Sequence, residues 1–388
     1  MTDILSGNET WEQLYASLAS RVDLDGLAAE TGALLRRRRI RDLASLLRLA
    51  LTYANEGGLR TTAAWAAQMG IAELSDVALL KRLRRASDWL IAVASALLPK
   101  LDPAKLDPAE LDPAEPIAAS HRLRVIDASC ISMPGSSGTD WRLHAVFDPV
   151  QQRFVDFDLT DAKGGEGFEH FTVAPGEIWL GDRGYIACSG LQHVLDGGAE
   201  LIVRAGWNAF RLLEPDGGEF NLFETLRETG THLDCPIVIE DRRKKRLLSD
   251  LRLVAWRKTP EATAKDRLRI RREAKRKGKT PDPRSLEAAQ WVILVTSLNP
   301  ASFPTDTILA MYRWRWQIEI AFKRLKSLAH LDALPIRAPA LARAWIGAKL
   351  ISAILIEQSI QEFLESPPCA DGTSHTSTFG LAPLPVGL

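Results

Sequence analysis

The chain has 388 residues, and its 49 Lys and Arg residues balance its 49 Asp and Glu residues. Hydrophobic residues make up 46% of it, which is enough for real cores and excludes a wholly disordered chain. No apolar run reaches the ~18–20 residues that a membrane span needs, and the polar, acidic first residues are not those of a secretory signal. The length favours two or three domains.

The cysteines indicate the compartment. All four lie far apart in the sequence, and no pair of them has the spacing of zinc ligands. A chain of this size needs no disulfide bonds to hold its fold. We therefore expect a reduced, cytoplasmic protein with no membrane partner.

Residues 1–100 are predicted to be helical, because apolar residues recur at helical spacing and strand patterns are absent. We interpret them as a helical DNA-binding domain because of a basic pattern within them. Within it, residues 61–85 fit a helix-turn-helix with a basic edge, although an ordinary helical pair has the same pattern. A Leu-Asp-Pro-Ala repeat then fills residues 101–116. Proline at every fifth position prevents a regular helix, so this segment is predicted to be a Pro-rich linker.

After the linker the pattern changes to short apolar segments separated by turn residues, and we expect the first part of an α/β core over 117–205. The expected strands are Leu123–Ile126, Leu143–Phe147, Phe154–Leu159, Glu177–Leu180 and Glu200–Val203. The first three should form an antiparallel meander because their connections are short. Helical segments are expected at 166–171 and 188–195.

Residues 206–298 interrupt this rhythm and are predicted to be a β-rich, basic insertion, with strands at 237–239, 251–256 and 291–296. Residues 241–284 hold 18 Lys and Arg against 6 Asp and Glu. Such a block indicates either a polyanionic partner or a solvated basic helix. The second part of the core, 299–364, is expected to consist of two long helices, Thr305–Leu328 and Pro339–Leu364, before a disordered tail over 365–388.

Three carboxylates stand where a sheet and a helix can present them together. Asp127 follows an apolar strand segment, Asp182 follows another, and Glu319 lies within the first long helix. Carboxylate oxygens suit Mg²⁺, and two such ions can activate an attacking oxygen and stabilise a leaving one at phosphorus. Each carboxylate taken alone is more often a surface or capping residue.

The helix itself strengthens the hypothesis. At about 100° per residue, five of its charged and aromatic side chains fall within a sector of ~100°, and the apolar side chains lie on the opposite side. That polar sector holds Tyr312, Arg315, Trp316, Glu319 and Lys326. Cations beside a metal-binding carboxylate suit phosphates, and an indole could stack on an unpaired base. An ordinary amphipathic helix with a charged face is the alternative.

Several segments together resemble the bacterial insertion-sequence DDE transposases, specifically the insertion element four group with its Tyr-Arg-Glu-Lys signature. The matching segments are VIDASCISMPGSSGTDWRLHAVFD at 125–148, GEIWLGDRGY at 176–185, WVILVTSL at 291–298, YRWRWQIEIAFKRLK at 312–326 and the helical stretch at 59–90. The resemblance covers roughly residues 30–360. Any one segment would be weak evidence, whereas the set with its helix spacing is specific.

This resemblance implies an α/β fold: a ribonuclease H-like core with an inserted β-rich subdomain, preceded by an all-helical N-terminal domain. It implies cleavage of transposon ends and strand transfer into target DNA, dependent on Mg²⁺ with Mn²⁺ as the alternative, by a homodimer on DNA. By motif, Asp127, Asp182 and Glu319 are catalytic metal ligands. Tyr312, Arg315 and Lys326 would contact phosphates, and Trp316 would stabilise a flipped base.

Two rival functions stay open: a catalytically silent DNA-binding repressor, and a structure-specific nuclease on the same fold. The sequence indicates three weaker site candidates, Glu166 as a support of the metal site, Asp161 and a structural His144. The Pro- and Ser-rich tail suggests a truncated C-terminus and weak dimerisation. The terminal repeat, the target preference and the cleavage route cannot be read from the sequence.

Overall fold

The computed structural model describes residues 8–98, 122–136, 138–241, 246–331 and 334–365. The predicted linker at 101–116, the predicted tail beyond Glu365 and residues 242–245 of the basic block lie outside these ranges.

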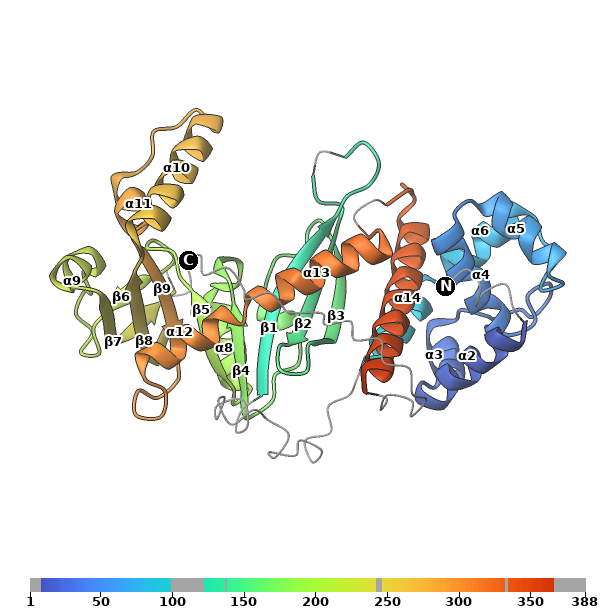
Figure 1. Cartoon of the computed structure of the whole chain (residues 1–388), viewed down its shortest axis with the longest axis horizontal. Helices are drawn as coiled ribbons and strands as arrows, with labels where there is room; N and C mark the ends of the chain where they lie inside the picture. Colours follow the sequence, from blue (N-terminus) through green and yellow to red (C-terminus); the bar gives the residue numbers. More distant parts are fainter. Residues whose placement is uncertain (1–7, 99–121, 137, 242–245, 332–333, 366–388) are drawn as a thin grey trace, which may run out of the picture.

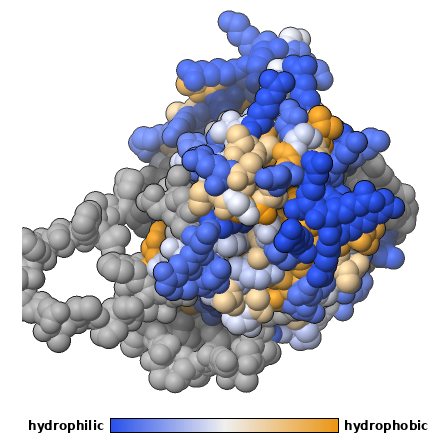
Figure 2. Space-filling model, turned by 90° about the vertical axis from the view of Figure 1, so that its right-hand side faces the viewer, coloured by the Kyte–Doolittle hydropathy of each residue, from blue (hydrophilic) through white to orange (hydrophobic). Residues whose placement is uncertain are grey.

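The N-terminal part is helical, as predicted. Its helices are α2 (Asn8–Arg21), α3 (Leu24–Thr31), α4 (Leu43–Glu56), α5 (Leu59–Gln68), α6 (Asp76–Arg85) and α7 (Ser87–Ala96). Side-chain caps define where three of them begin, because Asp23, Asp42 and Ser75 each accept a hydrogen bond from a backbone N–H of the first turn. Seen end on, this part of the molecule is mostly hydrophilic, with small apolar areas between the polar side chains (Figure 2).

The last helix, α14 (Pro339–Glu365), ties the N-terminal helices to the rest of the chain. It packs against α4, α6 and α7 on one side and against α13 (Trp316–Ala329) on the other (Figure 1). A Cβ on Gly347 would come within 2.9 Å of Leu90, so glycine permits this close approach of α14 to α7. The helix is long and apolar enough to cross a membrane, but 78% of that stretch is buried inside the protein, as in the core helix of a globular fold.

Within the described ranges, all named strands belong to one mixed sheet of nine strands, in the order β3-β2-β1-β4-β5-β9-β8-β7-β6. The first five are β1 (Arg122–Ile131), β2 (Trp141–Asp148), β3 (Arg153–Asp161), β4 (Glu177–Gly181) and β5 (Glu200–Arg204). Strands β1 to β3 form the predicted antiparallel meander, whereas β4 runs parallel to β1 and β5 parallel to β4. A mixed α/β fold is therefore confirmed.

A buried ionic group fixes the centre of this sheet. The Arg124 side chain is only 3% exposed, and it donates at 3.0 Å both to Asp148 of β2 and to Glu177 of β4. Removing one partner from such a group leaves a buried charge uncompensated, at a cost of about 3–5 kcal/mol. The three strands β1, β2 and β4 are thus locked in register.

The predicted insertion extends the same sheet. Its strands are β6 (Arg211–Leu213), β7 (His232–Glu240), β8 (Leu247–Arg257) and β9 (Trp291–Thr296), and β9 pairs antiparallel with both β5 and β8. Its helices are α9 (Leu222–Glu228), α10 (Pro260–Arg276) and α11 (Pro283–Ala288). Helix α10 projects from the sheet at the end far from the N-terminal helices (Figure 1).

Between the strands of the core, the segment predicted as helical at 166–171 forms only a 3₁₀ turn, η3 (Phe168–His170), whereas α8 (Cys188–Asp196) forms as predicted. A second 3₁₀ turn, η4 (Arg183–Tyr185), follows β4 directly.

The prediction of one continuous helix over Thr305–Leu328 is wrong. Helix α12 (Thr305–Arg313) ends and α13 begins at Trp316, because the backbone between them tightens into 3₁₀-type turns. The N–H of Trp314 bonds to the carbonyl of Met311 at 3.0 Å, and that of Arg315 to Tyr312 at 3.1 Å. The helical phase calculated across this break therefore does not hold.

Candidate active site

Asp127 and Asp182 lie on neighbouring parallel strands. In the ladder between β1 and β4, Val125 pairs with Leu180, and each aspartate comes two residues after its member of this pair. Glu319 lies on α13, which packs against β1. The fold thus brings two carboxylates to one edge of the sheet and places a helix with the third carboxylate beside them.

The three carboxylates share one electrostatic environment. Burial raises the pKa of Asp127 to about 6, and the charges of Asp182 and Glu319 act in the same direction. A backbone hydrogen bond from Ala128 at 2.8 Å and the charge of Arg315 oppose this rise. Asp127 is therefore a buried carboxyl group near two other carboxylates, and a bound cation would favour its ionised form.

The donor set fits a divalent cation. Within the part of the chain that is described, no three His, Cys, Asp or Glu side chains stand close enough to hold one metal ion between them. A tight group of three is not required, because Mg²⁺ is usually held by one or two carboxylates together with water and substrate phosphates. Asp182 keeps one oxygen turned to the backbone, accepting a hydrogen bond from Gly184 at 2.7 Å.

Glu319 is held by a neighbouring cation. The Arg315 guanidinium donates to Glu319 Oε1 at 2.6 Å, with side-chain exposures of 15% and 31%. Arg315 also lies 5.9 Å from the centre of the Tyr312 ring. Arg315, at the junction of α12 and α13, thus contacts both the phenol ring and the carboxylate.

The candidate DNA contacts do not share one exposed face. Tyr312 is 8% exposed and belongs to the hydrophobic core, so its predicted place on an open polar face is wrong. The break after Arg313 places Tyr312 on α12, whereas Trp316 and Lys326 lie on α13. Trp316 is 53% exposed, with the Lys323 ammonium 5.9 Å from its ring, and Lys326 is half-buried.

The weaker candidates have structural contacts. His144 is fully buried, stacks on His170 with ring centres 3.9 Å apart and bonds through Nε2 to the Thr160 hydroxyl at 3.0 Å. Burial lowers the pKa of His144 to about 4, and the nearby His170 adds to this effect, so the ring is neutral at pH 7. Asp161 accepts a hydrogen bond from the Lys163 N–H at 2.9 Å at the end of β3.

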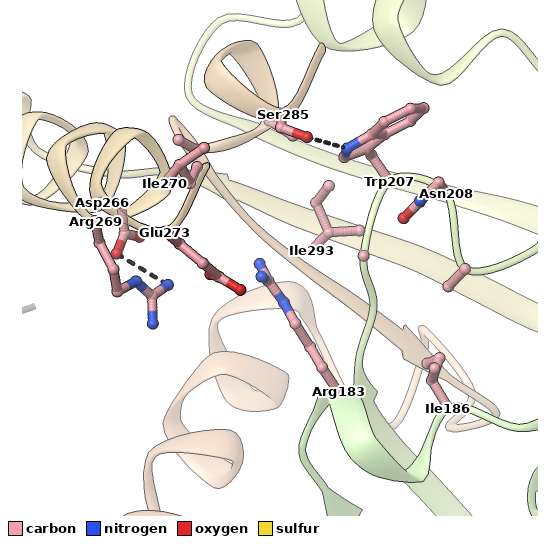
Figure 3. Close-up of a pocket in the computed structure, with 14 residues that line it drawn as sticks. Arg183, Ile186, Trp207, Asn208, Asp266, Arg269, Ile270, Glu273, Ser285 and Ile293 are labelled. Atoms are coloured by element: carbon pink, nitrogen blue, oxygen red, sulfur yellow. Dashed lines mark hydrogen bonds and ion pairs between the residues drawn. The ribbon is translucent and has the colours of Figure 1, made fainter. Parts of the chain in front are cut away.

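A pocket of about 540 Å³ lies beside this edge, and nothing in the sequence had indicated it. Arg183, the residue after Asp182, extends into it toward Glu273 of α10 (Figure 3). On another wall Trp207 donates to the Ser285 hydroxyl at 3.1 Å (Figure 3). The lining comes from four separate segments of the chain, at 183–186, 206–209, 266–273 and 285–293, which is why no local motif reveals it.

Comparisons with known proteins indicate one family for this chain. Residues 118–355 match the family described as a transposase DDE domain. The chain is 38% identical over 374 residues to the putative transposase InsL for insertion sequence element IS186A of Escherichia coli (strain K12), covering 94% of this chain and 98% of that protein. The transposase for insertion sequence element IS421 of Escherichia coli is also 38% identical, over 375 residues and the same shares.

Other proteins are similar to this chain at lower sequence identity. The transposase for insertion sequence element IS231F of Bacillus thuringiensis subsp. israelensis is 24% identical over 243 residues, which is 54% of this chain and 50% of that protein. A cryo-EM structure of the piggyBac transposase synaptic complex with hairpin DNA has a TM-score of 0.39 and 10% identity, covering 94% of this chain and 85% of that chain. The family match and the 38% relatives show that this chain belongs to the insertion-sequence DDE transposases, enzymes that act on DNA with a divalent metal ion.

Proposed function

We propose that this transposase cuts DNA at the ends of its insertion sequence and joins the freed ends to target DNA, with Asp127, Asp182 and Glu319 as the ligands of Mg²⁺. Mn²⁺ would substitute for it. The observation that supports this most is geometric: Asp127 and Asp182 each lie two residues after a paired position of the parallel strands β1 and β4, and α13, which carries Glu319, packs against β1. Bound ions would activate the attacking oxygen and stabilise the leaving oxygen at phosphorus.

The chain's own part in this chemistry is to fix the carboxylates and to bind the DNA. The ladder between β1 and β4 fixes Asp127 relative to Asp182, and Arg315 holds Glu319. Arg315 is then placed to meet a phosphate oxygen next to that carboxylate, because a guanidinium offers several donors in a planar fork.

The remaining DNA contacts follow from the same helix pair. Trp316, the most exposed of the candidates, offers an open ring on which a flipped base would stack. Lys326 lies about two turns further along α13 than Glu319 and would contact the backbone. Tyr312 is buried, and the charges of Arg315, Arg204 and Asp182 act on its hydroxyl, so it would reach a phosphate only at the edge that carries Asp182.

The finer fold assignment also belongs to the proposal. The order β3-β2-β1-β4-β5, with three antiparallel strands followed by two parallel ones, supports a ribonuclease H-like core. The segment 206–298 would be a subdomain inserted before the acidic helix, although β6 to β9 continue the core sheet. With the Tyr-Arg-Glu-Lys residues in place, we assign the chain to the insertion element four group, acting in the cytoplasm as a dimer on DNA.

The test is a cleavage assay on a labelled transposon end with Mg²⁺, followed by joining of a pre-cleaved end to a target plasmid. Asp127→Asn, Asp182→Asn and Glu319→Gln should each bind the end but not cut it. Asp156→Asn is the control, since Asp156 is a half-buried carboxylate on β3 with a raised pKa due to burial. Binding without cleavage by the unaltered protein would indicate a silent repressor, and cleavage without joining would indicate a nuclease.

A further inference from the structure

A fourth carboxylate lies beside Asp182. Glu166 belongs to the segment between β3 and η3, and its side chain reaches Gly184, two residues after Asp182. A Cβ on Gly184 would collide with Glu166 Oε2 and would stand 3.1 Å from Asp182 Oδ1. The two carboxylates therefore flank the same backbone position, and glycine there leaves the space that Glu166 occupies.

The backbone before Glu166 is held in place from two sides. Arg142 of β2 donates to the carbonyl of Gly164 at 2.6 Å, and His170 Nε2 bonds to the carbonyl of Gly165 at 2.8 Å. His170 Nδ1 in turn contacts Asp158 of β3 at 2.7 Å. Two consecutive carbonyls are thus anchored to the meander, and the position of Glu166 follows from the fold of the core.

An independent observation indicates that this cluster receives a polar ligand. Tyr185 is fully buried, and its hydroxyl has no hydrogen-bond partner among the residues that the structure describes. The charges that act on this hydroxyl include those of Asp127, Glu166 and Asp182, so these carboxylates lie near it. A buried hydroxyl without a hydrogen-bond partner is destabilising, and a polar group bound at the carboxylates would supply the partner.

We propose that Glu166 is a fourth carboxylate of the metal site and binds, together with Asp182, one of the divalent cations. The proposal rests on the function proposed above and goes beyond the acidic triad of the signature. Two carboxylates flanking one glycine repel each other unless a cation lies between them. Arg142 is the positive charge that acts on Glu166, and it is already engaged by the Gly164 carbonyl. Tyr185 is then a positioning residue whose hydroxyl supports the carboxylates or their bound water.

The test measures binding of Mn²⁺ alone to the full chain without DNA, by isothermal titration calorimetry. Glu166→Gln should weaken Mn²⁺ binding about 10-fold or more, as the removal of ligands and their supporting groups does in other metal sites. Glu169→Gln is the matched control, because Glu169 is an exposed carboxylate three residues further along the same segment and should leave the affinity unchanged. Tyr185→Phe should weaken binding less than Glu166→Gln does.

The outcomes separate this proposal from the one on which it rests. If Asp182→Asn weakens Mn²⁺ binding while Glu166→Gln matches Glu169→Gln, Glu166 is not a ligand and only the present proposal fails. If Asp127→Asn and Asp182→Asn both leave the affinity unchanged, the metal site itself is wrongly placed. Should Glu166→Gln lose its native circular dichroism, Glu166→Asp tests the same point, since a carboxylate moved back by one methylene should still weaken binding.

Discussion

The acidic edge, formed by Asp127, Asp182 and Glu319, and the basic helix α10 carry opposite charges. Their charged side chains also differ in burial and in contacts. At the acidic edge the carboxylates are partly buried, and each one is fixed by a strand ladder, a hydrogen bond or an ion pair. On α10 nearly every charged side chain is exposed, and Thr263 is the buried residue of the helix. Fixed, interacting charges suit chemistry at one phosphorus atom, whereas exposed charges suit loose contact with a polyanion.

This contrast predicts that single changes at the acidic edge have the largest effect. Asp182→Asn, which keeps the shape of the side chain, should slow cleavage of a transposon end roughly 10³-fold or more, because transition-state charge loses several kcal/mol of stabilisation. End binding in a gel-shift assay should change less than about threefold. Cleavage within tenfold of the unaltered rate would remove Asp182 from the site.

The acidic edge should also affect stability, with a definite sign. The folded-state pKa of Asp127 is about 6, above its ordinary value of 3.8, so the fold favours the protonated form. Its contribution to stability is complete below pH ~4 and is lost as the pH rises through 6. In metal-free protein at pH 7.5, Asp127→Asn should therefore raise the free energy of unfolding by up to about 2–3 kcal/mol.

Urea titrations at pH 4 and pH 7.5 measure this effect. The gain should disappear at pH 4, and Mg²⁺ should reduce it at pH 7.5, since the ion stabilises the carboxylate but not the amide. An equal gain at both pH values would mean that the substitution acts through packing.

An intermediate effect is expected for Arg315 and Lys326, cations on either side of Glu319 in the sequence. Arg315→Ala should slow cleavage about 10- to 100-fold, because it removes both the phosphate contact and the partner of Glu319. Lys326→Ala should have a smaller effect, since Lys326 lies further along α13. Neither should lower the melting temperature by more than a few degrees. A large fall for Arg315→Ala would show that its contact with the Tyr312 ring stabilises the helix junction.

The sequence predicted those strands, helices and site residues that depend on a local pattern of side chains. Strands such as β1 and β9, and helix α14, lie where hydrophobic periodicity places them, because the burial of alternate or helically spaced side chains is written into consecutive residues. The carboxylates Asp127 and Asp182 could be located for the same reason, since each one follows a buried strand segment.

The rest depends on contacts between distant segments. Trp314 and Arg315 are residues that a helix accepts, so nothing local marks the break between α12 and α13. The approach of Glu166 to Gly184 becomes visible only when the segment before η3 packs against the end of β4. The pocket at Arg183 likewise needs α10 and the loop at Trp207 to meet.

The smallest single-residue effects are expected on α10. Its last six residues include four exposed cations, Arg271, Arg272, Lys275 and Arg276. Changing all four to Gln should weaken DNA binding and flatten its salt dependence, because removing one cation from a phosphate lowers the slope of log affinity against log salt by about 0.9. Each change alone should alter affinity only slightly, and the effects should add.

The matched control for α10 keeps the charge and changes the shape, with Lys in place of the three arginines and Arg in place of Lys275. If DNA is held loosely, this variant should bind with the slope of the unaltered protein, whereas recognition that depends on side-chain shape would weaken in it. An unchanged slope in the four-Gln variant would mean that α10 is a solvated helix that does not touch DNA. Helix α10 would then have no role in DNA binding. The catalytic role proposed for the fixed carboxylates of the acidic edge would not be affected.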